Sequence, residues 1–91
     1  MQVIYCDVHP FIVQQDVMIY NEETGERSEI GKISLKDLPE FIVNNCKEKD
    51  VHNVKLSGAK IFCEKFSKEI LNYSKSKYDN FELNVEVLKN E

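Results

Sequence analysis

One short stretch of the chain joins an apolar, strand-like run to a helical pattern through Ser57, Gly58 and Lys60. At such a corner the N–H groups of a helix's first turn, helped by a lysine, could bind an anion. The stretch does not match the phosphate-binding loop G-x-x-x-x-G-K-[ST], because Ile61 follows Lys60. We therefore expect Ser57 to cap the helix and Gly58 to form the turn, with only weak anion binding at Ser57, Gly58 and Lys60.

A second stretch with reactive side chains ends the first strand-like run. Asp7 and His9 could act as an acid–base pair, with Ser57 or Cys6 as the nucleophile. Pro10 indicates that a turn has begun at this point, so we expect His9 to be a surface turn residue and predict no catalytic residue.

The remaining candidates for metal or redox chemistry are few. His9 and His52 are far apart and have no cysteine motif beside them, so no metal site and no cofactor are predicted. We expect His52 to face solvent or to contact a helix end. The three cysteines are odd in number and lie among apolar neighbours. They are typical of buried free thiols, which predicts an intracellular, cytoplasmic protein. No leader and no apolar run of about 18 residues is present, so no membrane partner is expected.

The charge of the chain argues against nucleic acid as a partner. The 91 residues carry a formal net charge of −4, and Arg27 is the only arginine among twelve basic residues. Proteins that grip nucleic acid through bulk electrostatics are basic, and arginine supplies the forked contacts to phosphate and guanine.

Alternating and helical periodicities predict one mixed α/β domain over residues 1–91, with residues 89–91 frayed. Asp37 and Glu40 form a predicted capping box at the start of the first helix, with Pro39 in its first turn. A hairpin turn over residues 21–25 follows the second strand. The strands are predicted at residues 2–7, 11–20, 26–33, 51–56 and 81–88, the helices at residues 37–49 and from 59 onwards, and a polar connection at 74–80.

The order β-β-β-α-β-α-β predicts a five-stranded sheet in the spatial order 3-2-1-4-5, with right-handed crossovers that place both helices on one face. The other face is then uncovered, and an exposed apolar group on it is a candidate contact surface. The residues predicted for this interaction surface are Ile12, Asp16, Met18, Tyr20, Glu82 and Glu86.

This element order resembles the ribonuclease H-like core shared by ribonuclease H, resolvase-type nucleases and actin-like ATPases. Asp7 stands at the end of the first strand, as an aspartate does in that family, and residues 56–59 resemble the strand-Gly-helix corner of the actin-like branch. The resemblance implies a metal-dependent nuclease using Mg²⁺ or Mn²⁺, with Asp7, Glu40 and Asp79 as its acids, or a nucleotide-binding domain. Glu48 is an alternative to Glu40.

The chain departs from the pattern of that family at its key positions. A nuclease would place an acid at the end of the fourth strand, where this sequence has Ser57. An ATPase would place a Gly-rich hairpin after Asp7, where this sequence has Val8 to Phe11 with Pro10.

Three functional hypotheses follow. The first is a small acidic, non-enzymatic protein that binds another protein or itself through a sheet face or edge, as expected of a phage or mobile-element accessory protein. The second is the enzyme or nucleotide-binding domain implied by the resemblance. The third is an acidic decoy for a nucleic-acid-binding protein, which requires carboxylates clustered on one face.

Overall fold

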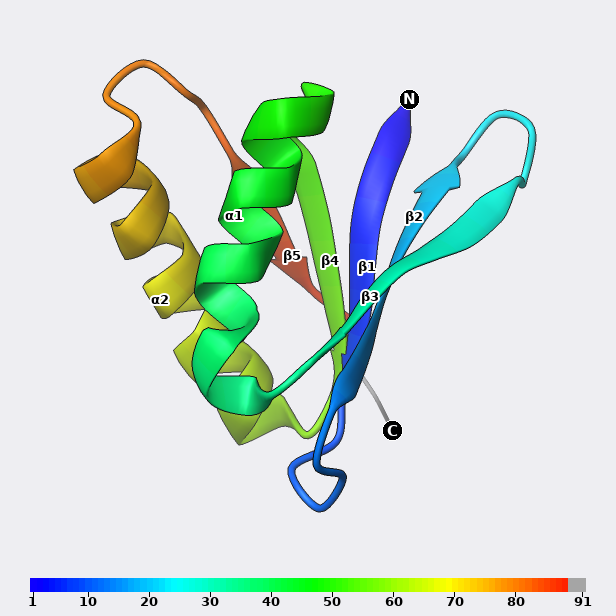
Figure 1. Ribbon diagram of the computed structural model, residues 1–91, viewed down its shortest axis with the longest axis vertical. Coiled ribbons are helices and arrows are strands. Elements are labelled where there is room, and N and C mark those ends of the chain that lie inside the picture. The colour runs from blue at the N-terminus through cyan, green and yellow to red at the C-terminus, as the bar shows by residue number, and fades with distance from the viewer. Residues whose placement is uncertain (89–91) are drawn as a thin grey trace.

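The computed structural model describes residues 1–88, which form one five-stranded mixed sheet with two long helices (Figure 1). The sheet order is β3-β2-β1-β4-β5, so the predicted topology is confirmed. The prediction of a frayed end at residues 89–91 lies outside the described part of the chain. The elements are β1 (Gln2–Val8), β2 (Gln15–Asn21), β3 (Arg27–Ile33), a 3-10 turn η1 (Leu35–Asp37), α1 (Leu38–Lys49), β4 (Asn53–Gly58), α2 (Lys60–Lys77) and β5 (Asn84–Val87).

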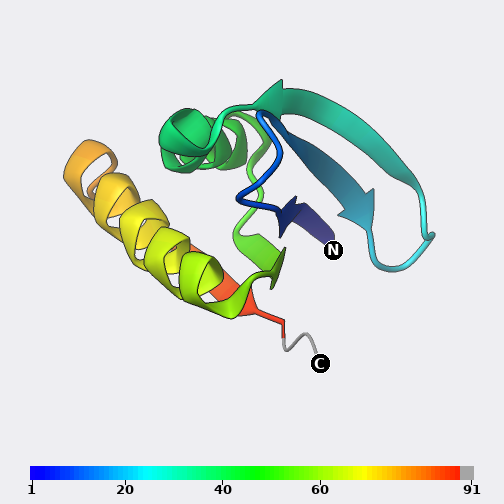
Figure 2. The same ribbon diagram turned by 90° about the horizontal axis from the view of Figure 1, so that it is seen from below.

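The central strand β1 organises the sheet. It pairs antiparallel with β2 and parallel with β4, and β5 extends the parallel half beyond β4. Both helices pack on the same face of the sheet, and no helix of residues 1–88 lies on the opposite face (Figures 1 and 2). The carboxyl ends of β1 and β4 lie at the same end of the molecule as the start of α2, the lower end in Figure 1.

The core lies between the sheet and the helices. Alternate residues of β1, β2 and β4 point to the helices, which return an apolar stripe at helical spacing. This interior is continuous, because both helices contribute to it together with the three central strands. Its buried members are Ile4, Cys6, Val8, Val17, Leu38, Ile42, Val43, Cys46, Val51, Val54, Leu56, Cys63, Phe66 and Ile70.

Four elements have boundaries that differ from the prediction by two residues or more, and one of them is β4, which spans Asn53–Gly58 instead of residues 51–56. β2 begins at Gln15, so residues 11–14 form a loop rather than the first part of a strand. α2 runs on to Lys77 through the stretch predicted as a connection, because its polar residues occupy the outer side of a helix that stays buried at Ile70 and Ser74. β5 starts at Asn84 and is only four residues long.

The N-cap of α1 was predicted at the right residue, but its capping box does not form, and the predicted cap of α2 was wrong. Asp37 is the N-cap of α1 by position, but its side chain makes no capping bond; it accepts a hydrogen bond of 3.0 Å from the Ser34 hydroxyl. Ala59 is the N-cap of α2, and Ser57 lies inside β4. Both helices therefore begin without a hydrogen bond from a capping side chain.

Gly58 closes the corner between β4 and α2. Its φ is +109°, and a Cβ atom there would lie 2.2 Å from the carbonyl oxygen of Val8. Only glycine fits this close approach of two parallel strands. The prediction that Gly58 forms the turn is therefore confirmed.

Candidate interaction surface

A chain of hydrogen bonds links the predicted reactive residues at the carboxyl ends of β1 and β4. Asp7 accepts a bond of 2.8 Å from the Ser57 hydroxyl, and its other oxygen lies 2.8 Å from Nε2 of His9. Tyr5 lies 2.6 Å from the same Ser57 oxygen. Since a carboxylate only accepts, Ser57 uses its proton on Asp7, and Tyr5 must donate to Ser57.

This order differs from that of a Ser–His–Asp triad. In a triad the histidine accepts the serine proton, whereas here Asp7 accepts it and His9 contacts Asp7 instead of Ser57. The structure thus brings Asp7, His9 and Ser57 together, although His9 was expected to be only a turn residue. The network fixes the ends of two strands against each other.

The acids proposed for an enzyme lie on separate elements. Glu40 is in the first turn of α1. Asp79 follows α2, whose last turn lies at the opposite end of the sheet from the carboxyl end of β1 (Figure 1). Within residues 1–88, no three His, Cys, Asp or Glu side chains gather so that they could hold a metal ion. Glu48 lies at the far end of α1 from Glu40.

At the predicted anion site, the Ser57 hydroxyl is engaged by Asp7 and the Ser57 carbonyl accepts a bond of 3.2 Å from the Cys63 thiol. The N–H of Ala59 lies 3.4 Å from the Val8 carbonyl. Lys60 is the first residue of α2. The other polar groups of the predicted anion site therefore make their contacts mainly within the chain.

The uncovered face of the sheet carries three of the predicted interaction residues on β2 and one on β5. Met18 and Tyr20 are half-buried there, while Asp16 and Glu86 are exposed. Glu82 precedes β5 and is not part of a strand.

Two residues that the sequence did not single out complete an apolar hollow on this face. Tyr5 packs edge-to-face on Tyr20 with ring centroids 6.4 Å apart, and Arg27 closes the side toward β3. With Met18, these side chains line a cavity of about 380 Å³. Tyr5 alternates with buried residues along β1. This alternation was the sequence signal that could have placed Tyr5 on the uncovered face.

The most exposed apolar residues lie in the loop between β1 and β2. Phe11 is 99% exposed, Ile12 53% and Val13 85%. Ile12 was predicted on the sheet face, and this was wrong because β2 starts three residues later. These side chains contribute almost nothing to the core, so the fold does not require them to be apolar.

Gln15 holds this loop in one conformation. The side chain is 2% exposed, accepts a bond of 2.7 Å from the His9 N–H, and donates bonds of 2.9 Å to the carbonyls of His9 and Ile12. A further backbone bond of 3.1 Å joins Ile12 N–H to the His9 carbonyl. Burial of a side-chain amide is unfavourable unless the amide is hydrogen-bonded. The Gln15 amide makes its three hydrogen bonds to the backbone of the loop.

We call residues 9–14, held by Gln15, the stapled loop. Sequence reasoning missed Phe11, Val13 and Gln15 because an apolar, β-branched run is typical of a strand. Pro10 was the sequence signal that the first strand had ended and that a loop had begun. Ile61 is 79% exposed in the first turn of α2, and α2 begins at the same end of the molecule as the loop between β1 and β2 (Figure 1).

The titratable groups outside these surfaces have structural roles. Burial, with a smaller effect of the Asp7 charge, raises the pKa of Cys6 to about 12, and burial raises the pKa of Cys46 to about 12. The pKa of His52 is raised by its bond of 2.7 Å to the Glu82 carbonyl and then by Asp50, 2.9 Å away at the end of α1. His52 is thus a helix-end contact, as expected.

Comparison with known proteins gave no match, either to a protein-family model or to a curated protein. In the part of the chain that the structure describes, no helix is long and apolar enough to cross a membrane.

Proposed function

We propose that this protein is a non-enzymatic binding protein that docks on another protein through the stapled loop. The observation that carries the proposal is an ordered loop whose apolar side chains are turned to solvent, with Phe11 almost completely exposed. Exposed apolar groups that the fold does not need are typical of contact sites, and a loop already ordered by Gln15 loses little conformational entropy on binding.

The partner expected for this loop is a protein with an apolar cleft. Phe11 and Val13 would enter the cleft, and the hollow on the uncovered sheet face extends the contact. Burying a Phe or Val side chain stabilises a complex by about 1.5–3 kcal/mol each. The shared element order with the ribonuclease H-like core describes the scaffold and carries no function by itself.

The test compares capture of partners by the immobilised wild-type protein and by the Phe11→Ser/Val13→Ser variant. Both side chains are exposed, so the variant should keep the wild-type stability. A partner recovered with the wild type, purified and titrated by calorimetry should bind the variant at least about 100-fold more weakly. Lys68→Ser, on the exposed side of α2, is the control and should bind normally.

Three outcomes contradict the proposal. Equal binding of the loop variant would move the contact elsewhere on the molecule. A concentration-dependent dimer in sedimentation that the loop variant abolishes would make a second copy the occupant. Retention on neutral phosphatidylcholine vesicles that needs Phe11 would make it a lipid surface.

A further inference from the structure

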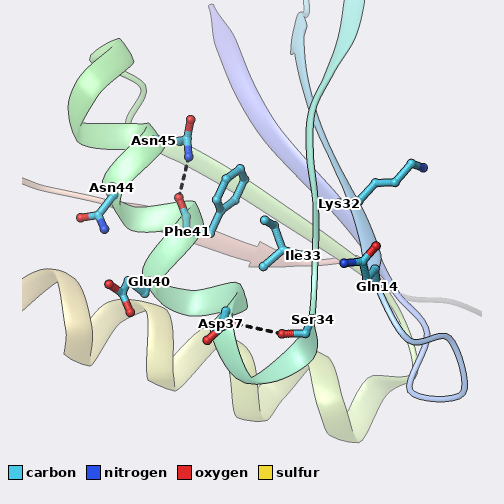
Figure 3. A pocket seen from close by; sticks show the side chains of 9 residues that line it. All are labelled: Gln14, Lys32, Ile33, Ser34, Asp37, Glu40, Phe41, Asn44 and Asn45. Atoms are coloured by element: carbon cyan, nitrogen blue, oxygen red, sulfur yellow. Dashed lines mark hydrogen bonds between the residues drawn. The ribbon is translucent and has the colours of Figure 1, made fainter.

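A groove borders the outer side of β3, and α1 forms its opposite wall (Figure 3). It has a volume of about 480 Å³. β3 is the terminal strand of the sheet, so within residues 1–88 its outer backbone groups have no strand partner. Unpaired groups of this kind are a template for one more strand.

The apolar part of the groove is rigid. The Phe41 ring packs on β3 so closely that a Cβ atom at Gly31 would lie 2.6 Å from it. Ile33 points from β3 toward α1 beside this ring (Figure 3). Asn45 donates a bond of 2.9 Å to the Phe41 carbonyl, which fixes the amide on the wall.

The charged part of the groove is acidic. The Lys32 ammonium lies 2.6 Å from Asp16 and 3.4 Å from Glu29, so its charge is already balanced. Asp37 and Glu40 also line the groove, and neither has a cation within 4.0 Å in the described chain. Both sit at the start of α1, and a basic ligand would complement them.

The outer edge of β3 can pair with a further strand only on one side of a β-bulge. The pairing of β2 with β3 shifts between Val17 and Met18, which leaves Ile30 as the extra residue of a bulge. Bulges twist an edge away from further pairing. The regular segment that borders the groove is Gly31–Ile33, enough to pair with about three residues of an extended peptide.

We propose that an extended, basic segment of a partner protein binds in this groove as a sixth strand. Its backbone pairs with β3, an apolar side chain lies on Phe41 and Ile33, and a lysine or arginine reaches Asp37 and Glu40. This binding mode goes beyond the docking of the stapled loop, because it uses a different surface and a different part of a partner.

The test uses fluorescence anisotropy of a labelled, end-blocked octapeptide with the repeat Val-Ser-Lys-Ser, in which valine and lysine point to the same face of an extended strand. The wild-type protein should bind it, and the Asp37→Lys/Glu40→Lys variant should bind at least about tenfold more weakly. The control Glu64→Lys/Glu69→Lys makes the same change in net charge at exposed sites on α2, whose residues do not line the groove, and should lose less than about threefold. The Phe11→Ser/Val13→Ser variant should bind the peptide as the wild type does, which separates this proposal from the first.

The backbone contact is tested with the same octapeptide carrying N-methyl groups on alternate residues, which removes the N–H donors of one edge. This peptide should not bind. The proposal is overturned if the unmodified peptide fails to bind, if both charge variants weaken binding equally, or if N-methylation has no effect. It is also overturned if the protein sediments as a dimer that Asp37→Lys/Glu40→Lys dissociates, since a second copy would then occupy the groove.

Discussion

Replacing Gln15 by methionine should release the stapled loop while preserving the shape of the side chain. Gln15 makes three hydrogen bonds to the loop backbone and is 2% exposed. At about 0.5–1.5 kcal/mol for each bond, the loss lies between about 1.5 and 4.5 kcal/mol. The freed groups of an outer loop can reach water, and methionine is well tolerated in a core, so we expect a loss of about 2 kcal/mol in the free energy of unfolding.

Urea unfolding followed by far-ultraviolet circular dichroism measures this loss, and the melting temperature should fall by roughly 8–16 °C. The amide of His9 should lose its protection in hydrogen exchange, because its acceptor is removed. Gln14→Met, at the exposed neighbouring position, is the matched control and should change stability by less than about 0.5 kcal/mol. A Gln15→Met variant as stable as this control, with the His9 amide still protected, would refute the stapled loop.

Three further predictions concern Gly58, the buried cysteines and His52. Gly58→Ala should destabilise the fold by about 3 kcal/mol or more in urea, whereas Gly25→Ala, which also has positive φ but no atom within 4 Å, should lose only about 1 kcal/mol; equal losses would contradict the close approach. Cys6 and Cys46 should stay unreactive toward a disulfide dye at pH 8 until denaturant is added, and fast labelling of the native protein would contradict their burial. His52 should titrate by NMR above its ordinary 6.5, so its stabilising contribution is complete below pH 6.5 and is lost as the pH rises through the raised pKa; a midpoint at or below 6.5 would contradict this.

The sheet order could be predicted because the relevant signals are local. Residues change from a period of two to a period of about 3.6 after β3, and right-handed crossovers leave few arrangements for the strands that follow. The turn at Gly58 was predicted from the same kind of local sequence pattern. Its close contact with Val8 depends on the register of β1 against β4, which no local pattern contains.

The stapled loop could not be predicted, because its conformation depends on a side chain that reaches back across six residues. Phe11 to Val13 have the composition of a strand, and only the bonds from Gln15 to His9 and Ile12 show why they form a loop. The end of α2 was missed for a related reason. A polar run is compatible with a helix whose outer side faces solvent. Ser74 is buried because of its position on the inner side of α2, although serine is a polar residue.

The Asp7 network shows how far residue types can mislead. Aspartate, histidine and serine suggested catalysis, and they do meet at the ends of β1 and β4. Their order places the carboxylate between the other two groups, so the proton of Ser57 is committed to Asp7. Spatial order, rather than proximity alone, decides what such a cluster does.

Site-specific photo-crosslinking at position 11 tests the central claim most directly. A benzoylphenylalanine in place of Phe11 should form an adduct of one defined mass with the partner protein, and excess unlabelled wild type should suppress that adduct. Excess Phe11→Ser/Val13→Ser variant should not suppress it, and the same probe at Thr24, exposed in the β2–β3 hairpin, should form no adduct. The absence of an adduct at position 11, or equal labelling from both positions, would contradict binding through the stapled loop.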